Sequence, residues 1–168
     1  MSKLIHLELS NKILAAAFTV HSILGPGLLE SCYEGAMVVE LEKAGIPCQR
    51  QRVFPLRYKG AMVGDYIADL VADNTIILEL KSVKMLNAVM AAQIVSYLKI
   101  SGCAVGYLIN FNSLIVQWKR FVNHKREWSR FFSKDCVRAD TIFCTLLVRL
   151  YRSMFRGKNI IDLYYTYV

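Results

Sequence analysis

Charged side chains interrupt a stretch of the sequence that otherwise has the composition of a buried strand. In "DLVADNTIILELKSV", residues 69–83, the charged groups Asp69, Glu79 and Lys81 lie among aliphatic residues. An unpaired charge in a protein interior costs several kcal/mol, so such groups are usually absent unless they pair or hold a ligand. This stretch is therefore the first candidate for a chemical site.

The expected hairpin brings these charged groups to one face of a sheet. Residues 73–75 predict a three-residue turn with Asn74 in the left-handed conformation, which asparagine tolerates better than most residues. In that register Asp69 directly faces Glu79. Opposed residues share a face of the sheet, and so do residues two apart on one strand. Asp69, Glu79 and Lys81 are therefore expected on one side, and the leucines that flank Glu79 on the other.

Two opposed carboxylates repel each other, so this arrangement favours a bound cation. Mg²⁺ takes oxygen ligands in near-octahedral geometry and is usually held by one or two carboxylates together with substrate phosphates. A lysine beside it stabilises anionic charge on a phosphate or orients an attacking water. The alternative is a solvent-facing Glu-x-Lys ion pair, which is the commoner setting of this pattern and contributes little to stability.

Two helical segments add polar residues to the candidate site. Gln93 and Tyr97 are four residues apart, so they share one face of the helix that is expected directly after the lysine strand. Glu30 lies near the start of an earlier helix and has partly apolar helical neighbours. An ordinary helix surface also explains the first pair, and a favourable helix dipole also explains Glu30.

The order of elements predicts a mixed α/β sheet with helices packed on it. Apolar periodicity, with Gly and Pro at the breaks, indicates helices at 11–24, 28–44 and 86–101 and strands at 50–58, 61–72, 76–83, 104–111 and 114–121. An antiparallel meander followed by a crossover helix and further strands gives this architecture. Pro55 places the first strand at an edge or a bulge.

The positive charge is concentrated at the end of the chain. The 168 residues have a formal net charge of +8, of which residues 119–168 hold +7, with 11 Lys and Arg against 4 Asp and Glu. We place a boundary between a domain at 1–122 and a basic, aromatic-containing extension at 123–168. Such an extension suits a DNA-gripping arm or a membrane-surface helix, and a basic segment with no selected function is the alternative.

Composition excludes several other classes of protein. No apolar window reaches the length of a spanning helix, and no cationic segment opens a signal peptide. The five cysteines and three histidines lack the spacing of a zinc site or a histidine-based triad. We therefore expect a cytoplasmic protein with reduced thiols and no transmembrane segment.

Taken together, the motifs resemble those of a known family. "GLLESCY", residues 27–33, matches the G-x-x-E-x-x-Y signature of the GxxExxY family of small prokaryotic proteins, which is grouped with the PD-(D/E)xK nuclease superfamily. The resemblance continues through "YKGAMVGDYIADLVADNTIILELKSV", "AAQIVSYLKISG" and "VGYLINF" and covers residues 10–122. The chain is also similar to the RecB-like branch, in which a Q-x3-Y helix follows the lysine strand.

The resemblance implies a fold and a role for each matching residue. The fold is an α/β, restriction-endonuclease-like PD-(D/E)xK core, a mixed central sheet flanked by helices, here with the basic C-terminal extension. Its metal ligands are Glu30, Asp69, Glu79 and the carbonyl of Leu80; its catalytic residues are Glu30, Asp69, Glu79, Lys81 and Gln93; its nucleic-acid contacts are Lys81 and Tyr97. Gly27 and Tyr33 are expected to have structural roles.

The implied activity is that of a nuclease. We expect a Mg²⁺- or Mn²⁺-dependent enzyme that hydrolyses phosphodiester bonds in nucleic acid, with DNA favoured over RNA. The alternatives are a non-catalytic nucleic-acid-binding or regulatory module on the same fold, and an interaction protein whose Glu-x-Lys is a surface ion pair. A protein partner or a homodimer is a further expectation, because the nearly neutral core domain has limited grip on phosphate.

Overall fold

The computed structural model describes residues 5–123, which form three helices and five strands. The elements in chain order are α1 (Leu7–Leu24), α2 (Glu30–Lys43), β1 (Cys48–Tyr58), β2 (Ala61–Ala72), β3 (Ile76–Lys81), α3 (Ala88–Ser101), β4 (Val105–Asn110) and β5 (Gln117–Val122). The basic extension and its boundary at residue 123 fall at or beyond the end of this range and stay predictions. Within residues 5–123, no helix is long and apolar enough to cross a membrane.

The five strands lie in the sheet in the order of the sequence, from β1 to β5. β1, β2 and β3 form an antiparallel meander, β3 and β4 are parallel, and β5 returns antiparallel to β4. The parallel step needs a crossover, which α3 supplies. The mixed α/β sheet expected from the sequence is thus confirmed, and β1, which contains Pro55, is an edge strand where a missing N–H is tolerated.

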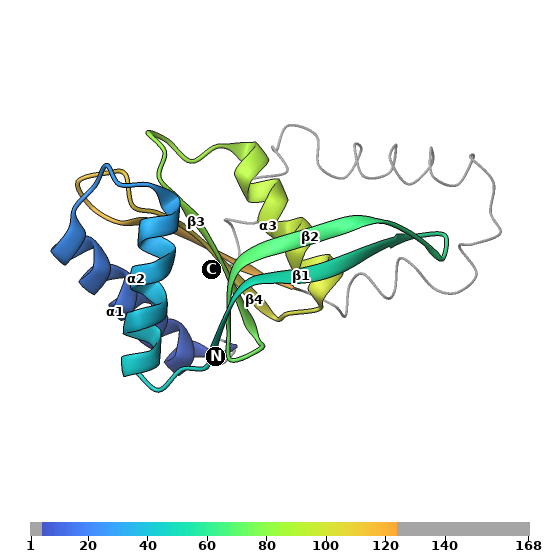
Figure 1. Ribbon diagram of the computed structural model, residues 1–168, viewed down its shortest axis with the longest axis horizontal. Coiled ribbons are helices and arrows are strands. Elements are labelled where there is room, and N and C mark those ends of the chain that lie inside the picture. Colours follow the sequence, from blue (N-terminus) through green and yellow to red (C-terminus); the bar gives the residue numbers. More distant parts are fainter. Residues whose placement is uncertain (1–4, 124–168) are drawn as a thin grey trace, which may run out of the picture. The chain divides into compact units, whose positions relative to one another are not determined.

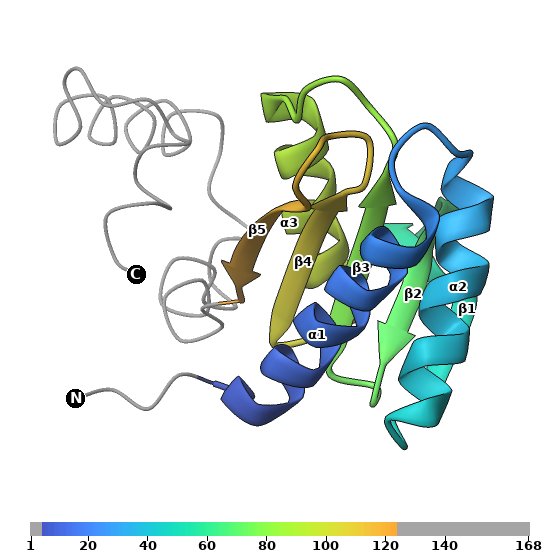
Figure 2. The same cartoon turned by 90° about the vertical axis from the view of Figure 1, so that its left-hand side faces the viewer.

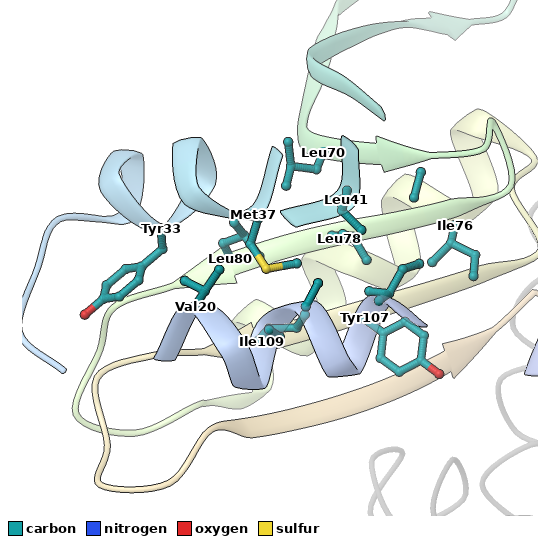
Figure 3. Close-up of a cluster of buried hydrophobic side chains, with 14 of the residues drawn as sticks. Val20, Tyr33, Met37, Leu41, Leu70, Ile76, Leu78, Leu80, Tyr107 and Ile109 are labelled. Carbon is teal, nitrogen blue, oxygen red and sulfur yellow. The ribbon is translucent and has the colours of Figure 1, made fainter. Parts of the chain in front are cut away.

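Helices cover both faces of the sheet (Figures 1 and 2). α1 and α2 pack on one face and enclose a first core, part of which is drawn in Figure 3, and α3 packs on the other face over a second core. All six residues of β4 are buried, as expected for a strand covered on both sides. At Gly106 an added Cβ would lie 2.8 Å from Cγ1 of Ile94, so this glycine permits the close approach of α3.

The turn between β2 and β3 has the expected position, but one more of its residues has a positive φ than the sequence predicted. Asp73 and Asn74 both have positive φ, at 49° and 54°, where the sequence predicted this only for Asn74. The amide of Thr75 donates to the carbonyl of Ala72 at 3.0 Å. Ala72 then pairs with Ile76, which is the register predicted from the sequence.

Some element ends differ from the prediction, and side-chain contacts account for two of the differences. α2 begins at Glu30 rather than residue 28, since the backbone amide of Leu28 donates to the hydroxyl of Tyr33 at 3.1 Å. β3 ends at Lys81 rather than Val83, because the amide of Val83 donates to the Asn110 side chain at 3.0 Å. α1 begins at Leu7, four residues before the predicted start.

Both strands of the first hairpin change the face they present partway along. In a regular strand, residues an even number apart share a face. Cys48 nevertheless packs against the first core while Phe54 lies in the second, and on β2 Leu70 lies in the first core while Ala68 lies in the second. Gln51, between the two β1 residues, has a positive φ of 46°. The hairpin is therefore kinked at this point, beside Asp69.

Candidate active site

The alternation of β3 sends its charged and apolar side chains to opposite faces. Leu78 and Leu80 lie in the first core, toward α1 and α2. Glu79 and Lys81 consequently share the other face, which α3 covers, with Ile77 of the second core. Both charged residues lie at the carboxyl end of the strand, where the chain leaves the sheet.

The side chain of Asp69, on β2, accepts a backbone hydrogen bond from β3 in place of a strand carbonyl. The backbone pairing between β2 and β3 covers the residues from Leu70 to Ala72 and does not extend to Asp69, so the direct strand pairing of Asp69 with Glu79 that the sequence predicted is not formed. Instead, the amide of Leu80 donates to Oδ2 of Asp69 at 2.8 Å. This contact fixes the Asp69 carboxylate between the two residues that flank Leu80, namely Glu79 and Lys81.

Glu79 and Lys81 form an ion pair in which Glu79 is buried and Lys81 is half-buried. Nζ of Lys81 donates to Oε1 of Glu79 at 2.8 Å, and the side chains are 2% and 14% exposed for glutamate and lysine respectively. The solvent-facing ion pair, the commoner setting of this pattern, does not describe this site. The second oxygen, Oε2 of Glu79, is buried and has no hydrogen-bond partner within the described part of the chain.

The burial of this pair changes its protonation. Burial, and next the negative charge of Asp69, raises the pKa of Glu79 to about 7, although the hydrogen bond from Lys81 opposes the rise. Burial also raises the pKa of Asp69, against the effects of the Leu80 amide and the Lys81 ammonium. Burial alone would lower the pKa of Lys81, but Glu79 and the neighbouring carboxylates raise it. Lys81 is therefore a charged ammonium beside two carboxyl groups whose pKa values are raised.

Glu30 approaches the site from α2 but is held by a different partner. Its Oε1 accepts a hydrogen bond from the amide of Ser82 at 2.9 Å, and Oγ of Ser82 donates to the carbonyl of Leu28 at 2.6 Å. Among residues 5–123, no three His, Cys, Asp or Glu side chains are grouped closely enough to hold a metal ion. The structure thus brings Glu30 to the end of β3 without joining it to Asp69 and Glu79 in one coordination group.

The two β-strand carboxylates by themselves fit a hard divalent cation. Mg²⁺ and Mn²⁺ favour carboxylate and carbonyl oxygens, and Mg²⁺ is commonly held by only one or two carboxylates. The unpartnered Oε2 of Glu79 and the raised pKa values of Asp69 and Glu79 are what a cation would relieve, because a positive charge stabilises both ionised forms. The donor set of Asp69 and Glu79 is therefore compatible with the expected metal.

Gln93 and Tyr97 connect α3 to the strand that carries Asp69. Nε2 of Gln93 donates to the hydroxyl of Tyr97 at 3.3 Å, and that hydroxyl donates to the carbonyl of Ile67 at 2.6 Å. Tyr97 is buried, its ring meets Tyr66 edge-on at 5.3 Å, and burial raises its pKa. The pair supports the strand two residues before Asp69, while the expected contact of Tyr97 with nucleic acid stays a prediction.

Tyr33 shows why the G-x-x-E-x-x-Y residues belong together. Its hydroxyl donates to the carbonyl of Gly25 at 2.7 Å and accepts from the amide of Leu28, and its ring stacks on Phe111 with centroids 4.6 Å apart. Gly27, inside the loop so enclosed, has a φ of 99°, which favours glycine. The tyrosine therefore fixes the loop that leads into Glu30.

The sequence reasoning missed a second carboxylate of α2. Glu34 is 7% exposed, and its two oxygens accept from Nε of Arg50 and Nε2 of Gln51, each at 3.0 Å. These contacts hold the kink of β1, and the negative charge of Glu34 contributes to the raised pKa of Asp69. The available signal was its position one helical turn after Glu30.

Asn110 is a second residue that was missed. It is fully buried at the end of β4; its Oδ1 accepts from the amide of Val83, and its Nδ2 donates to the carbonyl of Val83 at 2.8 Å. This pair of bonds fixes the chain just after Lys81. The signal was a single amide side chain in the otherwise apolar run "YLINF".

Three comparisons relate the chain to known proteins, and the match to a family model agrees with this geometry. A family model described as the PD-(D/E)XK nuclease superfamily matches residues 7–121. A comparison with curated proteins finds no match. Among solved structures, the chain is similar to that of "Crystal structure of SSO0001", with 16% sequence identity and a TM-score of 0.45 over 74% of this chain and 62% of that one. The match over residues 7–121 takes in all of the site residues described above, and the chain belongs to the PD-(D/E)XK nuclease superfamily.

Proposed function

We propose that this chain is a metal-dependent nuclease that hydrolyses phosphodiester bonds in nucleic acid, with DNA favoured over RNA. The observation that carries the proposal is the ion pair of the buried Glu79 with Lys81 beside Asp69, which leaves Oε2 of Glu79 unpartnered within residues 5–123. A buried oxygen without a partner costs a structural ion pair free energy, whereas in a metal site it serves as a ligand. Perturbed carboxylates next to a charged lysine are also typical of catalytic sites.

Asp69 and Glu79 would hold Mg²⁺ or Mn²⁺, with the carbonyl of Leu80 as a further oxygen donor. Glu30 would join them as a ligand only by leaving the amide of Ser82, to which its Oε1 is hydrogen-bonded. When bound, such an ion polarises the phosphate and lowers the pKa of a coordinated water. Lys81 supplies a fixed positive charge in a site of low dielectric, where it stabilises the negative charge that develops during phosphoryl transfer. Gln93 and Tyr97 keep Asp69 in place through the carbonyl of Ile67.

Within the superfamily, we assign the chain to the GxxExxY family and to the RecB-like branch, in which a Q-x3-Y helix follows the lysine strand. The contacts of Tyr33 around Gly25–Leu28 support the first assignment, and the Gln93–Tyr97 hydrogen bond supports the second. We place the activity in the cytoplasm, in line with the free thiols of Cys32, Cys48 and Cys103.

The experiment that tests the proposal measures cleavage of labelled single- and double-stranded DNA and RNA with Mg²⁺, with Mn²⁺ and with chelator. Wild-type protein should cleave only with metal. Lys81→Ala should lower the cleavage rate by orders of magnitude and leave binding within a few-fold, because its charge acts in the transition state. Lys84→Ala is the matched control, since Lys84 is exposed in the loop after β3 and should behave as wild type.

A second substitution separates the ammonium group from charge alone. Lys81→Arg keeps the positive charge but cannot occupy the compact position 2.8 Å from Glu79, so cleavage should stay impaired. A non-catalytic nucleic-acid-binding module, the alternative function, predicts binding without cleavage under every metal condition. Full activity of Lys81→Ala, in a preparation free of contaminating nuclease, would remove the catalytic role of this lysine.

A further inference from the structure

The first hairpin continues beyond the site as a two-stranded ribbon, which we define as residues 52–67. β2 pairs with β3 only from Leu70 to Ala72, whereas β1 and β2 stay paired with each other out to Tyr58 and Ala61. Figure 1 shows this ribbon extending away from the rest of the described sheet. Its outer part is exposed, although a single projecting hairpin is only marginally stable in water.

The ribbon carries an excess of positive charge. It contains Arg52, Arg57 and Lys59 against a single acid, Asp65. At the tip, Nη1 of Arg57 donates to the carbonyl of Gly60 at 3.2 Å, and Nζ of Lys59 lies 5.5 Å from the ring centroid of Tyr58. Large exposed apolar side chains lie between the charges: Val53, Tyr58, Met62, Val63 and Ile67.

The ribbon also begins at the candidate site. The carbonyl of Ile67 accepts from Tyr97, and Asp69 follows two residues later. Eight residues separate Asp69 from Ala61 at the tip, and at about 3.3 Å per residue they reach at most about 26 Å. Base pairs are about 3.4 Å apart, so the tip lies at most about eight base pairs from the site along a duplex whose axis runs along the ribbon.

We propose that this ribbon is a DNA-binding arm that enters the major groove of duplex DNA about eight base pairs from the phosphate at Asp69, Glu79 and Lys81. The proposal rests on the proposed nuclease function and adds its substrate class. The major groove of B-DNA admits a two-stranded ribbon, and the deep, narrow major groove of duplex RNA does not. Arg57 and Lys59 match a phosphate backbone. The exposed arginine, tyrosine and methionine of the ribbon are also residue types enriched in protein interfaces, and a protein partner would appear in the test as an unchanged salt dependence on DNA.

The test measures binding in chelator, where no metal supports cleavage. The variant Arg57→Gln/Lys59→Gln removes two exposed charges from the tip. Its control, Lys12→Gln/Lys43→Gln, removes two exposed charges from α1 and α2, where each lysine forms a helical ion pair, with Glu8 and Glu40 respectively. Thermal melts should show that both variants are as stable as wild type.

The expected result depends on the length of the DNA. For a duplex of about 20 base pairs, the ribbon variant should show a salt dependence of log Kobs that is less steep by about 1.8, because two phosphates are no longer neutralised. For a hairpin-capped duplex of about 6 base pairs, which cannot reach the tip, wild type and the ribbon variant should bind equally. Duplex RNA and single-stranded DNA should be insensitive to the substitution, and the control variant should show no dependence on length.

Two outcomes separate the ribbon from the nuclease proposal. If the ribbon variant binds long duplex DNA with a less steep salt dependence while wild type cleaves no substrate with any metal, the DNA-binding arm is supported and the nuclease function is refuted. If wild type cleaves DNA and the ribbon variant binds long duplexes with an unchanged salt slope, the arm is overturned and the nuclease function stands. An equal loss on RNA or single strands would also overturn the assignment to duplex DNA.

Discussion

Replacing Glu79 by glutamine removes a carboxylate from the interior of the site and with it a pH-dependent cost of folding. The residue is 1% exposed, and the only hydrogen bond of its side chain within the described range is from Lys81. Glutamine keeps an oxygen at that position and has no charge to ionise. Comparing the two proteins across pH therefore isolates the contribution of this ionisation from the packing of the side chain.

The sign and size follow from the pKa of Glu79, which burial and the charge of Asp69 raise from 4.5 to about 7. Between these values the folded protein binds more protons than the unfolded chain, so the free energy of unfolding falls as pH rises through this window. The full difference corresponds to about 3 kcal/mol, since one pKa unit is about 1.4 kcal/mol. Glu79→Gln lacks this loss.

The assay is thermal or urea unfolding of both proteins in chelator at several pH values. Relative to Glu79→Gln, wild type should lose about 2 to 3 kcal/mol between about pH 5 and about pH 8. At about 2 to 4 °C per kcal/mol for a chain of this size, the gap between the two Tm values should change by about 4 to 12 °C. Glu42→Gln, at an exposed position of α2, should follow wild type.

Parallel pH profiles for wild type and Glu79→Gln would refute the reasoning. They would mean that Glu79 is ionised in the folded protein without cost, so that its environment is more polar than the burial of its side chain indicates. A saturating divalent cation should flatten the wild-type profile, because it binds the ionised carboxylates of the native state and not the unfolded chain.

Three further predictions concern the metal, the loop before α2 and the extension. Mn²⁺ should raise the Tm of wild type above its value in chelator, and Asp69→Asn should abolish this response. The variant should stay folded, because its amide keeps an oxygen that accepts from the amide of Leu80. Equal Tm values for wild type with and without metal would count against the site. Tyr33→Phe should lower the free energy of unfolding by about 1 to 3 kcal/mol in urea melts, since it leaves the Leu28 amide and the Gly25 carbonyl without their partner. An unchanged free energy of unfolding would show that water replaces the hydroxyl. Deleting the extension, residues 123–168, which hold 9 Lys and Arg against 4 Asp and Glu, should weaken nucleic-acid binding and flatten its salt dependence, while metal-dependent cleavage of short substrates survives. An unchanged salt slope would assign the extension another role.

Local sequence patterns were sufficient for the parts of the site that depend on backbone periodicity. The period of two along β3 places Glu79 and Lys81 on one face and their leucine neighbours on the other. The Asp73–Asn74 turn sets the register with β2, since these residue types tolerate positive φ. The four-residue spacing of Gln93 and Tyr97 gives a direct hydrogen bond. Each of these relations involves residues that are close in the chain or joined by one short turn.

The sequence was misleading or silent where contacts join distant segments. The kink at Gln51 depends on Glu34, which lies 17 residues earlier, and the amide that binds Glu30 belongs to Ser82, 52 residues later. The end of β3 depends in the same way on Asn110. No local pattern encodes such pairs, because each requires several elements to pack first.

What the sequence determined by itself was which residues carry the chemistry and which side of a strand or helix they occupy, because backbone geometry alone sets these periodicities. The tertiary structure decided whether the Glu-x-Lys pair is an exposed ion pair or a buried one. That outcome depends on α3 and the parallel strand β4, which enclose β3 on the face and edge that carry Glu79. Burial removes water from the carboxylate, and the loss of that solvation raises its pKa to about 7 and distinguishes a candidate active site from an ordinary surface charge.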